Sequence, residues 1–139
     1  KVRSGTDMAV LSIGHIGNLA AKGIDALEAQ GYSVAHYDMR FVKPIDELLL
    51  HEVFSKFKHV ITVEDHALNG GMGSAVLEFM GDHGYAAHVK RLAIPDRFIE
   101  HGSQPELYRE CGIDDIAVVE AVKEMLGEKG AKKNARASA

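Results

Sequence analysis

The chain has 139 residues, of which 46% are hydrophobic and 26% are charged, so its composition is that of one soluble globular domain. Its formal net charge of -4 offers no basic surface to a nucleic acid backbone, and no nucleic acid partner is expected. No apolar run approaches the ~20 residues that span a bilayer, and the opening KVRSGTDMAV lacks the layout of a secretory signal, so we expect no membrane partner and a cytoplasmic location.

The first half of the chain alternates short apolar runs with amphipathic ones. Residues 8–14 (MAVLSIG) predict a buried strand, because the run is short, rich in branched residues and ended by glycine. From residue 16 to 31 the apolar residues recur at three- and four-residue steps, which predicts a helix. A second strand is predicted near 33–38. Asp46 is then expected to cap a second helix, whose apolar stripe ends at Phe57.

The same alternation continues through the second half. Residues 59–65 (HVITVED) predict a third strand, and the apolar residues after the glycine-rich turn predict a third helix that ends near Gly84. Residues 86–94 (AAHVKRLAI) predict a fourth strand, which Pro95 ends because proline has no N–H to donate.

Two helices are predicted after the fourth strand. Ser103 and Glu106 fit a capping box, so a short helix is expected from there to Gly112. Residues 118–125 carry the apolar stripe of a terminal helix. The tail at 131–139 is small, polar and basic, and we expect it to be disordered, which leaves residues 1–130 as the folded domain.

Alternating strands and helices indicate an α/β protein, a parallel sheet covered by helices on both faces. In such a sheet, ligands bind at the carboxyl ends of the strands, where the winding direction reverses. The loops that follow Gly14, Arg40 and Glu64 are all expected to open on that edge.

The stretch VEDHALNGGMGSAV, residues 63–76, joins the third strand to the third helix. Gly70, Gly71, Gly73 and Ser74 would cradle a phosphate if their N–H groups pointed at it from the helix N-terminus. No Lys-Ser or Lys-Thr pair completes a G-x-x-x-x-G-K-[ST] loop. The alternative is a turn in which glycine permits positive φ and lets the helix approach the strand closely.

Glu64, Asp65 and His66 end the third strand. They would make an acid, an orienting group and a base if they faced one site. They would equally cap the next turn with their polar side chains, and consecutive strand residues point to opposite faces.

Neither a metal site nor a cysteine nucleophile is predicted. The chain has eight histidines, but no pair has the H-E-x-x-H spacing that puts two imidazoles on one helix face. Cys111 lies in RECG without a CxxC partner, which favours a structural thiol.

The segment PDRFIEHG, residues 95–102, is the least generic in the chain. It places Arg97, Glu100 and His101 around Phe98 and Ile99 in a polar loop, where apolar side chains are hard to justify by turn chemistry. We expect a contact loop to a neighbouring domain, a second subunit or a substrate. Arg97 and His101 are the first candidates if a substrate or an allosteric ligand binds there.

Three segments carry a resemblance to a known family. DMRFVKPID, TVEDHALNGGMGSAVLE and IPDRFIEHGSQPELYRECGID, in this order, resemble the C-terminal domain of the 1-deoxy-D-xylulose-5-phosphate synthases, which are transketolase-like thiamine enzymes. The resemblance runs from about Gly5 to Leu126. Looser forms of the first two segments are shared with transketolases and with the beta subunits of 2-oxo acid dehydrogenases. PDRFIEHG is similar to the pattern of the synthases themselves.

The resemblance implies a reaction that other domains perform. The family joins pyruvate to glyceraldehyde 3-phosphate with loss of carbon dioxide, using thiamine diphosphate and magnesium, as the entry to the non-mevalonate isoprenoid route. Its GDG and Asn cofactor motif belongs to the N-terminal domain, and its thiamine-activating glutamate to the middle domain. GDHG at residues 81–84 breaks the motif, so this chain is expected to bind neither cofactor.

For the fold, the resemblance implies a three-layer α/β/α sandwich with a mostly parallel sheet of about five strands. Its antiparallel edge strand would include KVRS at the start of the chain. The implied partners are the N-terminal and middle domains of the same enzyme and a second copy in a homodimer. The favoured function is therefore a C-terminal assembly domain, and whether the chain alone is an enzyme stays open. The alternatives are an independent small-anion or nucleotide-binding module and a fragment of a 2-oxo acid dehydrogenase beta subunit.

Overall fold

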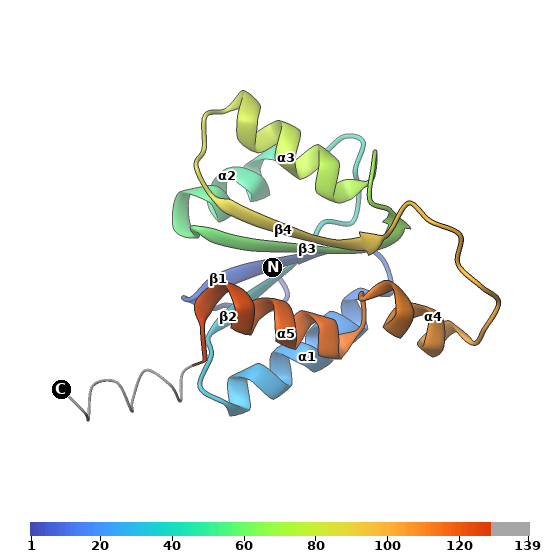
Figure 1. Cartoon of the computed structure of the whole chain (residues 1–139). Helices are drawn as coiled ribbons and strands as arrows, with labels where there is room; N and C mark the ends of the chain where they lie inside the picture. Colours follow the sequence, from blue (N-terminus) through green and yellow to red (C-terminus); the bar gives the residue numbers. More distant parts are fainter. Residues whose placement is uncertain (129–139) are drawn as a thin grey trace.

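The computed structural model describes residues 1–128 as an α/β/α sandwich (Figure 1). Strands and helices alternate in the order that the apolar patterns predict, and two helices follow the last strand. The elements are β1 (Met8–Ser12), α1 (Gly17–Ala29), β2 (Val34–Asp38), α2 (Glu47–Lys56), β3 (His59–Ala67), α3 (Met72–Asp82), β4 (His88–Ile94), α4 (Gln104–Cys111) and α5 (Asp115–Leu126).

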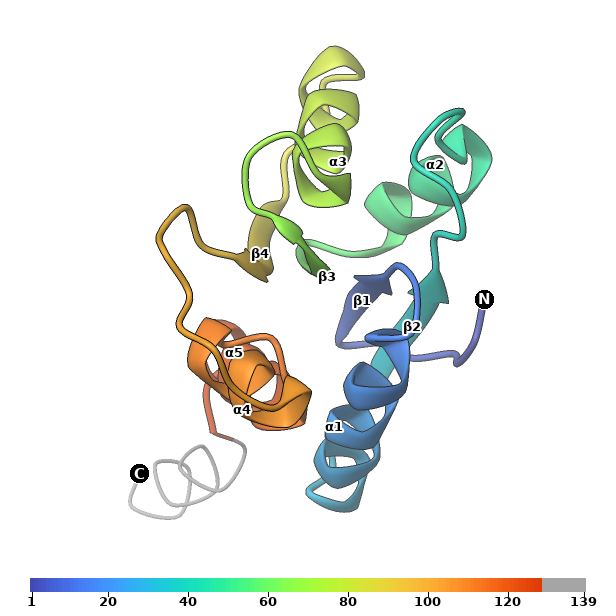
Figure 2. The same ribbon diagram turned by 90° about the vertical axis from the view of Figure 1, so that its right-hand side faces the viewer.

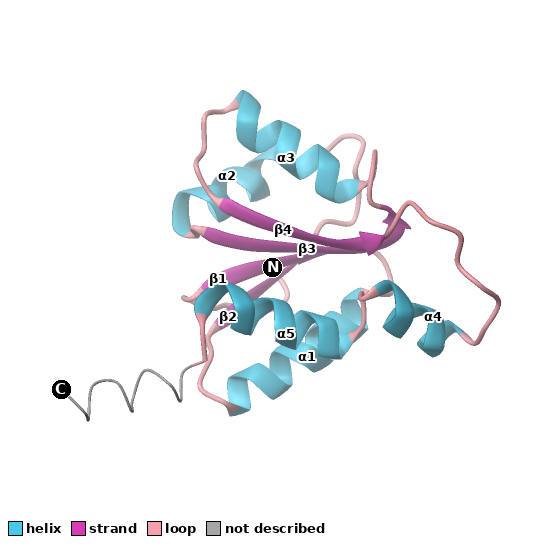
Figure 3. Ribbon diagram, viewed as in Figure 1, coloured by secondary structure: helices cyan, strands magenta, loops and turns pink. Residues whose placement is uncertain are grey.

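The sheet is parallel, with the strand order β2-β1-β3-β4. The chain first crosses from β1 to β2 on one side, and then passes to β3 and β4 on the other side. Helices α2 and α3 cover one face, and α1 and α5 cover the other (Figures 1 and 3). The winding direction therefore reverses between β1 and β3, which is where ligands bind in sheets of this kind.

Each face of the sheet has its own apolar core, because successive strand residues point to opposite sides. In β1, Val10 packs with the α1 and α5 side, and Leu11 packs with the α2 and α3 side. All five β1 residues are buried. The continuous apolar run MAVLS is thus explained by a strand that is covered on both faces.

The antiparallel edge strand is reduced to a single bridge between Arg3 and His36, so the described sheet has four strands instead of about five. The N–H groups of Val2 and Arg3 both donate to the carbonyl of His36, at 2.8 and 3.0 Å. Beyond this bridge, Gly5 lies against the β2 backbone, where an ideal Cβ would be only 2.9 Å from Cα of Val34.

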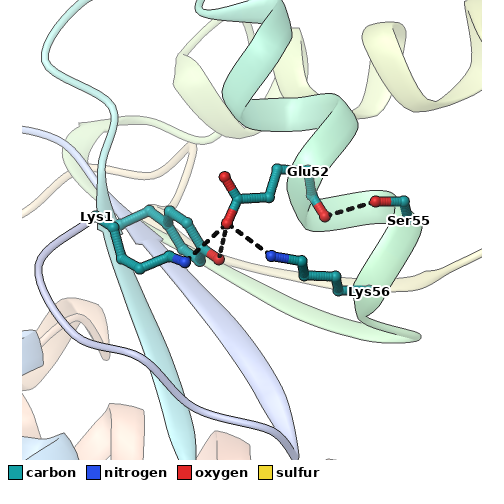
Figure 4. A network of polar contacts seen from close by, with 5 residues as sticks. Lys1, Glu52, Ser55 and Lys56 are labelled. Carbon is teal, nitrogen blue, oxygen red and sulfur yellow. Dashed lines mark hydrogen bonds and ion pairs between the residues drawn. The ribbon is translucent and has the colours of Figure 1, made fainter.

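The first residue of this segment is tied to α2 (Figure 4). Nζ of Lys1 lies 2.8 Å from Oε1 of Glu52, and Nζ of Lys56 lies 3.0 Å from the same oxygen. The Tyr37 hydroxyl also donates to it, at 3.2 Å. Three donors therefore converge on one carboxylate at the edge of the sheet.

Most of the predicted helix ends are confirmed. Oδ1 of Asp46 accepts the N–H of Leu49 at 3.0 Å, and Ser103 forms its capping box with Glu106. Gly112 ends α4 in the left-handed conformation, with φ of 69°. Strand β3 runs two residues further than predicted, to Ala67, and the predicted tail at 131–139 lies outside the described residues. Within residues 1–128 no helix is long and apolar enough to cross a membrane.

Candidate functional site

All four strands end at one side of the molecule, which we call the carboxyl edge. Figure 2 looks onto this edge and shows the loops that leave β1, β2, β3 and β4 gathered around it. The loops predicted to share an edge therefore do so.

A cleft of about 490 Å³ lies at the carboxyl edge, beside the point where the winding reverses. We call it the switch-point cleft. Its walls come from the end of β1, the loop after β2, and the turn between β3 and α3. Its volume is in the range of small-molecule pockets. The lining residues are Ile13, Val42, Lys43, Glu64, His66, Ala67, Asn69, Gly70, Gly71 and Met72.

Glu64 caps the N-terminus of α3 from inside the protein. Its side chain is only 1% exposed. Oε2 accepts the N–H of Met72 at 2.6 Å, and Oε1 accepts the N–H of Gly73 at 2.8 Å. These are the N–H groups at the start of the helix, where a negative charge is most favourable. The donors that would hold an external phosphate at this helix are thus bonded to a carboxylate of the chain itself.

The glycines of the turn have different roles. Gly70 has the positive φ that the sequence suggests, at 81°, whereas Gly71 has φ of -85° and needs no left-handed conformation. Gly71 is required for another reason. An ideal Cβ on it would lie 2.8 Å from Cδ of Glu64 and 2.9 Å from the carbonyl oxygen of Ala67. The close-approach interpretation holds at Gly71, and the positive-φ interpretation is wrong there.

Ser74 and Arg91 hold the turn closed. The Ser74 hydroxyl accepts the N–H of Gly70 at 3.1 Å and donates to the carbonyl of Leu68 at 3.1 Å. Arg91 of β4 donates to the same carbonyl at 2.9 Å and to the Ser74 hydroxyl at 3.2 Å. Sequence reasoning missed Arg91, because a lone arginine in an apolar strand carries no motif.

Glu64 and Asp65 lie on opposite faces of the sheet, as consecutive strand residues do. Asp65 faces α4, where its Oδ2 accepts the Tyr108 hydroxyl at 3.2 Å. Burial, and secondly the charge of Asp65, raise the pKa of Tyr108. His66 is 70% exposed and its Nδ1 lies 3.6 Å from Oδ1 of Asp65. The three residues therefore do not face one site, and the capping alternative describes Glu64.

The predicted contact loop lies on the α4 side. Arg97 is tied to the end of α4, because its guanidinium donates to Oε1 of Glu110 at 3.0 Å and to the carbonyl of Glu110 at 3.3 Å. Phe98 is 87% exposed, whereas Ile99 is half-buried and His101 is exposed. No hydrogen bond or ion pair in residues 1–128 joins Arg97 or His101 to the glycine turn. The candidate residues thus form two groups, one on each face.

Two features of the described residues bear on thiamine diphosphate and magnesium. Within the described part of the chain, no group of three or more His, Cys, Asp and Glu side chains is placed to hold a metal ion. The helix N–H groups of Met72 and Gly73, which would donate to a diphosphate at this position, already donate to Glu64. Burial raises the pKa of the half-buried Cys111, which favours the thiol over the nucleophilic thiolate.

The family is identified by comparison with known proteins. The family model described as "Transketolase, C-terminal domain" matches residues 1–118. The chain is 58% identical over 127 residues to a 1-deoxy-D-xylulose-5-phosphate synthase of Cytophaga hutchinsonii, a match that covers 91% of the chain and 20% of that protein. It is 41% identical over 129 residues to the synthase of a Geobacillus species, covering 92% of the chain and 20% of that protein.

The fold has a counterpart among solved structures. One described as "Split gene transketolase, inactive beta4 tetramer" matches with a TM-score of 0.81 and 34% sequence identity, covering 91% of this chain and 41% of that one. The chain spans about a fifth of the length of the curated relatives that it matches. These matches confirm the resemblance carried by the three quoted segments. The chain belongs to the transketolase C-terminal domain family.

Proposed function

We propose that the chain is the C-terminal domain of a 1-deoxy-D-xylulose-5-phosphate synthase, and that it supports the assembled enzyme without performing its chemistry. In this proposal, other parts of the enzyme bind thiamine diphosphate and magnesium and join pyruvate to glyceraldehyde 3-phosphate. The relatives that share 41% and 58% identity with the chain support this choice of enzyme.

The observation that carries the assembly role is the Glu64 cap. The carboxyl edge is the place where an α/β sheet of this topology binds ligands. Here the helix N-terminus at that edge is closed by a carboxylate that is 1% exposed and accepts two backbone N–H groups. The glycine turn thereby becomes a rigid connection that fixes α3 on the sheet. An independent phosphate-binding module has less support, because its donors would have to release Glu64.

The exposed apolar side chains also favour an interface. Phe98 and Phe41, both in loops that leave the carboxyl edge, are 87% and 67% exposed. Aromatic side chains are enriched in protein–protein interfaces relative to the rest of the surface. The proposed partners are the N-terminal and middle domains of the enzyme and a second copy of the chain. The cytoplasmic location stays a prediction.

A chimaera tests this function. In the synthase of Cytophaga hutchinsonii, this chain would replace the matching 127-residue segment. We expect the chimaera to form 1-deoxy-D-xylulose 5-phosphate and to sediment as the parent enzyme does, because the two segments are 58% identical. The same synthase without the segment is expected to lose both properties. A truncated synthase that remains as active and as assembled as the whole enzyme would overturn the proposal.

A further inference from the structure

We propose that Asn69 is a site of spontaneous deamidation, in which the backbone nitrogen of Gly70 displaces ammonia from the asparagine side chain. The products are aspartate and isoaspartate at position 69. The inference goes beyond the proposed function, because it concerns a covalent change that the chain undergoes by itself in water. It is carried by the Asn-Gly pair, by the exposure of the turn in which the pair lies, and by the hydrogen bonds that hold this turn.

Asn69 is followed by the residue that favours this reaction. The chain has three asparagines, and Asn69 precedes glycine, whereas Asn18 precedes Leu19 and Asn134 precedes alanine. A Cβ on the following residue crowds the nitrogen that has to attack, and it restricts the backbone angles from which the attack is possible. Glycine lacks this Cβ and has access to the widest range of angles. Asn69 is therefore the asparagine whose local sequence favours ring closure most.

The reaction needs no reagent other than water. The backbone nitrogen of Gly70 gives its proton to solvent and attacks Cγ of Asn69, which forms a new carbon–nitrogen bond. The bond from Cγ to Nδ2 breaks, and the amide group takes up a proton and leaves as ammonia. Water then adds to either carbonyl carbon of the resulting cyclic imide. Opening at one carbonyl gives aspartate, and opening at the other gives isoaspartate, in which the main chain passes through the side chain.

The structure leaves this pair open to solvent. Asn69 and Gly70 lie in the turn between β3 and α3 at the carboxyl edge (Figure 2), and both are exposed. In the part of the chain that the structure describes, no hydrogen bond holds the Asn69 side chain, so it is able to rotate toward the backbone nitrogen of Gly70. Asn18 is also exposed, but it lies in the first turn of α1, where the N–H of Leu19 donates to a main-chain carbonyl at 3.1 Å.

Ser74 controls the rate, because it holds the attacking nitrogen. The N–H of Gly70 donates to the Ser74 hydroxyl at 3.1 Å, and this hydroxyl donates to the carbonyl of Leu68 at 3.1 Å. Arg91 donates to the same carbonyl and to the same hydroxyl. The bond between Gly70 and Ser74 has to break before the nitrogen loses its proton and reaches Cγ of Asn69. Local opening of an exposed turn requires less free energy than unfolding of the domain, so the fold slows the reaction without preventing it.

The products loosen the connection between β3 and α3. A carboxylate at position 69 adds a negative charge to the lining of the switch-point cleft, where Glu64 already lies. Isoaspartate also inserts an additional main-chain carbon between Leu68 and Gly70, whose N–H groups are both held by hydrogen bonds. The turn cannot lengthen without releasing one of these bonds. The deamidated chain is therefore less stable than the original one.

Peptide mapping by mass spectrometry tests the site in the folded 139-residue chain during incubation in neutral buffer. Trypsin places Asn69 in peptide 59–90 and Asn18 in peptide 4–22, so each peptide reports one asparagine. We expect the mass increase that marks exchange of NH₂ for OH to develop about tenfold or more faster in peptide 59–90, because its asparagine precedes glycine. Isoaspartyl methyltransferase is expected to label this peptide, and Asn69→Gln to abolish both signals. An unchanged peptide 59–90, or equal rates in the two peptides, would overturn the inference.

Ser74→Ala tests the control of the rate. Loss of the hydroxyl releases the N–H of Gly70, and we expect deamidation at Asn69 to become about threefold or more faster. Val10→Ala destabilises the domain from the core on the other face of the sheet and leaves the turn unchanged, so it controls for reaction through global unfolding. Thermal unfolding checks that both variants are folded at the temperature of incubation. Equal acceleration by the two variants, or none by Ser74→Ala, would overturn the role of Ser74.

Discussion

The carboxylate of Glu64 fills the space that a side chain at position 71 would need, since an ideal Cβ on Gly71 would lie 2.8 Å from Cδ of Glu64 and closer still to Oε2. One glutamate thereby explains both the glycine and the start of α3. It caps the helix N–H groups from the strand side, and the missing side chain leaves room for it. Glu64 and Gly71 together make this turn a structural connection between β3 and α3, although its sequence resembles a phosphate-binding loop.

Gly71→Ala is expected to destabilise the fold by ~2 kcal/mol or more, because the new Cβ also meets the backbone oxygen of Ala67 at 2.9 Å and neither neighbour can move freely. Urea unfolding measures the change. Gly81→Ala is the control, in the helix that Gly71 precedes, where an added Cβ meets nothing within 4 Å. It is expected to stabilise the protein by up to ~1 kcal/mol, since alanine is the better helix former. Equal effects at the two positions would contradict the steric argument.

Glu64→Gln tests the cap. The amide has nearly the same shape but offers one acceptor oxygen, so one of the two N–H groups bonded to Glu64 would face an NH₂ group instead. We expect a loss of ~2 kcal/mol in the free energy of unfolding. Glu78→Gln, on the exposed face of the same helix, is expected to change it little. If Glu64→Gln were also neutral, the carboxylate would not be the cap that stabilises α3.

His36 is expected to make stability depend on pH. Burial, and secondly the charge of Arg3, lower its pKa from the ordinary 6.5, while Asp38 opposes them. The unfolded chain then binds more protons than the folded one between the two pKa values. The stability that neutral His36 contributes is therefore complete above pH 6.5 and is lost as the pH falls through the folded pKa.

The measurement compares urea unfolding of the wild type and His36→Gln across this pH range. The difference between the two free energies of unfolding is expected to shrink as the pH decreases. Only the wild type has an imidazole at position 36, and burial disfavours its protonation in the folded state. The neutral ring is also held by Ser12, whose hydroxyl oxygen lies 2.7 Å from Nε2 of His36. A difference that grows toward acid would show that the folded state favours the imidazolium.

Glu52 is expected to titrate far below the usual range. Hydrogen bonds from Lys1 and Lys56 lower its pKa from 4.5 to about 2. Since the folded value is depressed, the stability it contributes is present above pH 4.5 and is lost as the pH falls toward about 2. Carbon NMR of the Glu52 carboxyl group measures the midpoint directly. A midpoint near 4.5 would mean that the network in Figure 4 does not persist in solution.

The order of the elements was predictable from the sequence, because buried parallel strands are short continuous apolar runs and the covering helices have a periodic stripe. The Asp46 cap and the Ser103 capping box were predictable for the same reason, since each depends on residues three positions apart. The reduction of the fifth strand to one bridge was not predictable, because the pairing of Arg3 with His36 joins residues that are distant in the chain.

The candidate site was only partly predictable. The sequence places Glu64 near the glycines but does not say that its side chain turns toward the helix N-terminus, because that depends on which face of β3 it occupies. Arg91 and Tyr108 were missed entirely. Each acts on a residue more than 15 positions away, Arg91 on Leu68 and Tyr108 on Asp65, and local patterns hold no information on such contacts.

The central claim, that this domain supports chemistry performed elsewhere, is tested most directly by the turnover of pyruvate and glyceraldehyde 3-phosphate. The purified 139-residue chain is assayed with thiamine diphosphate and magnesium, beside the active chimaera as the positive control. We expect product from the chimaera and none above the protein-free blank from the chain alone. Formation of 1-deoxy-D-xylulose 5-phosphate by the chain alone, in proportion to its concentration, would contradict the account.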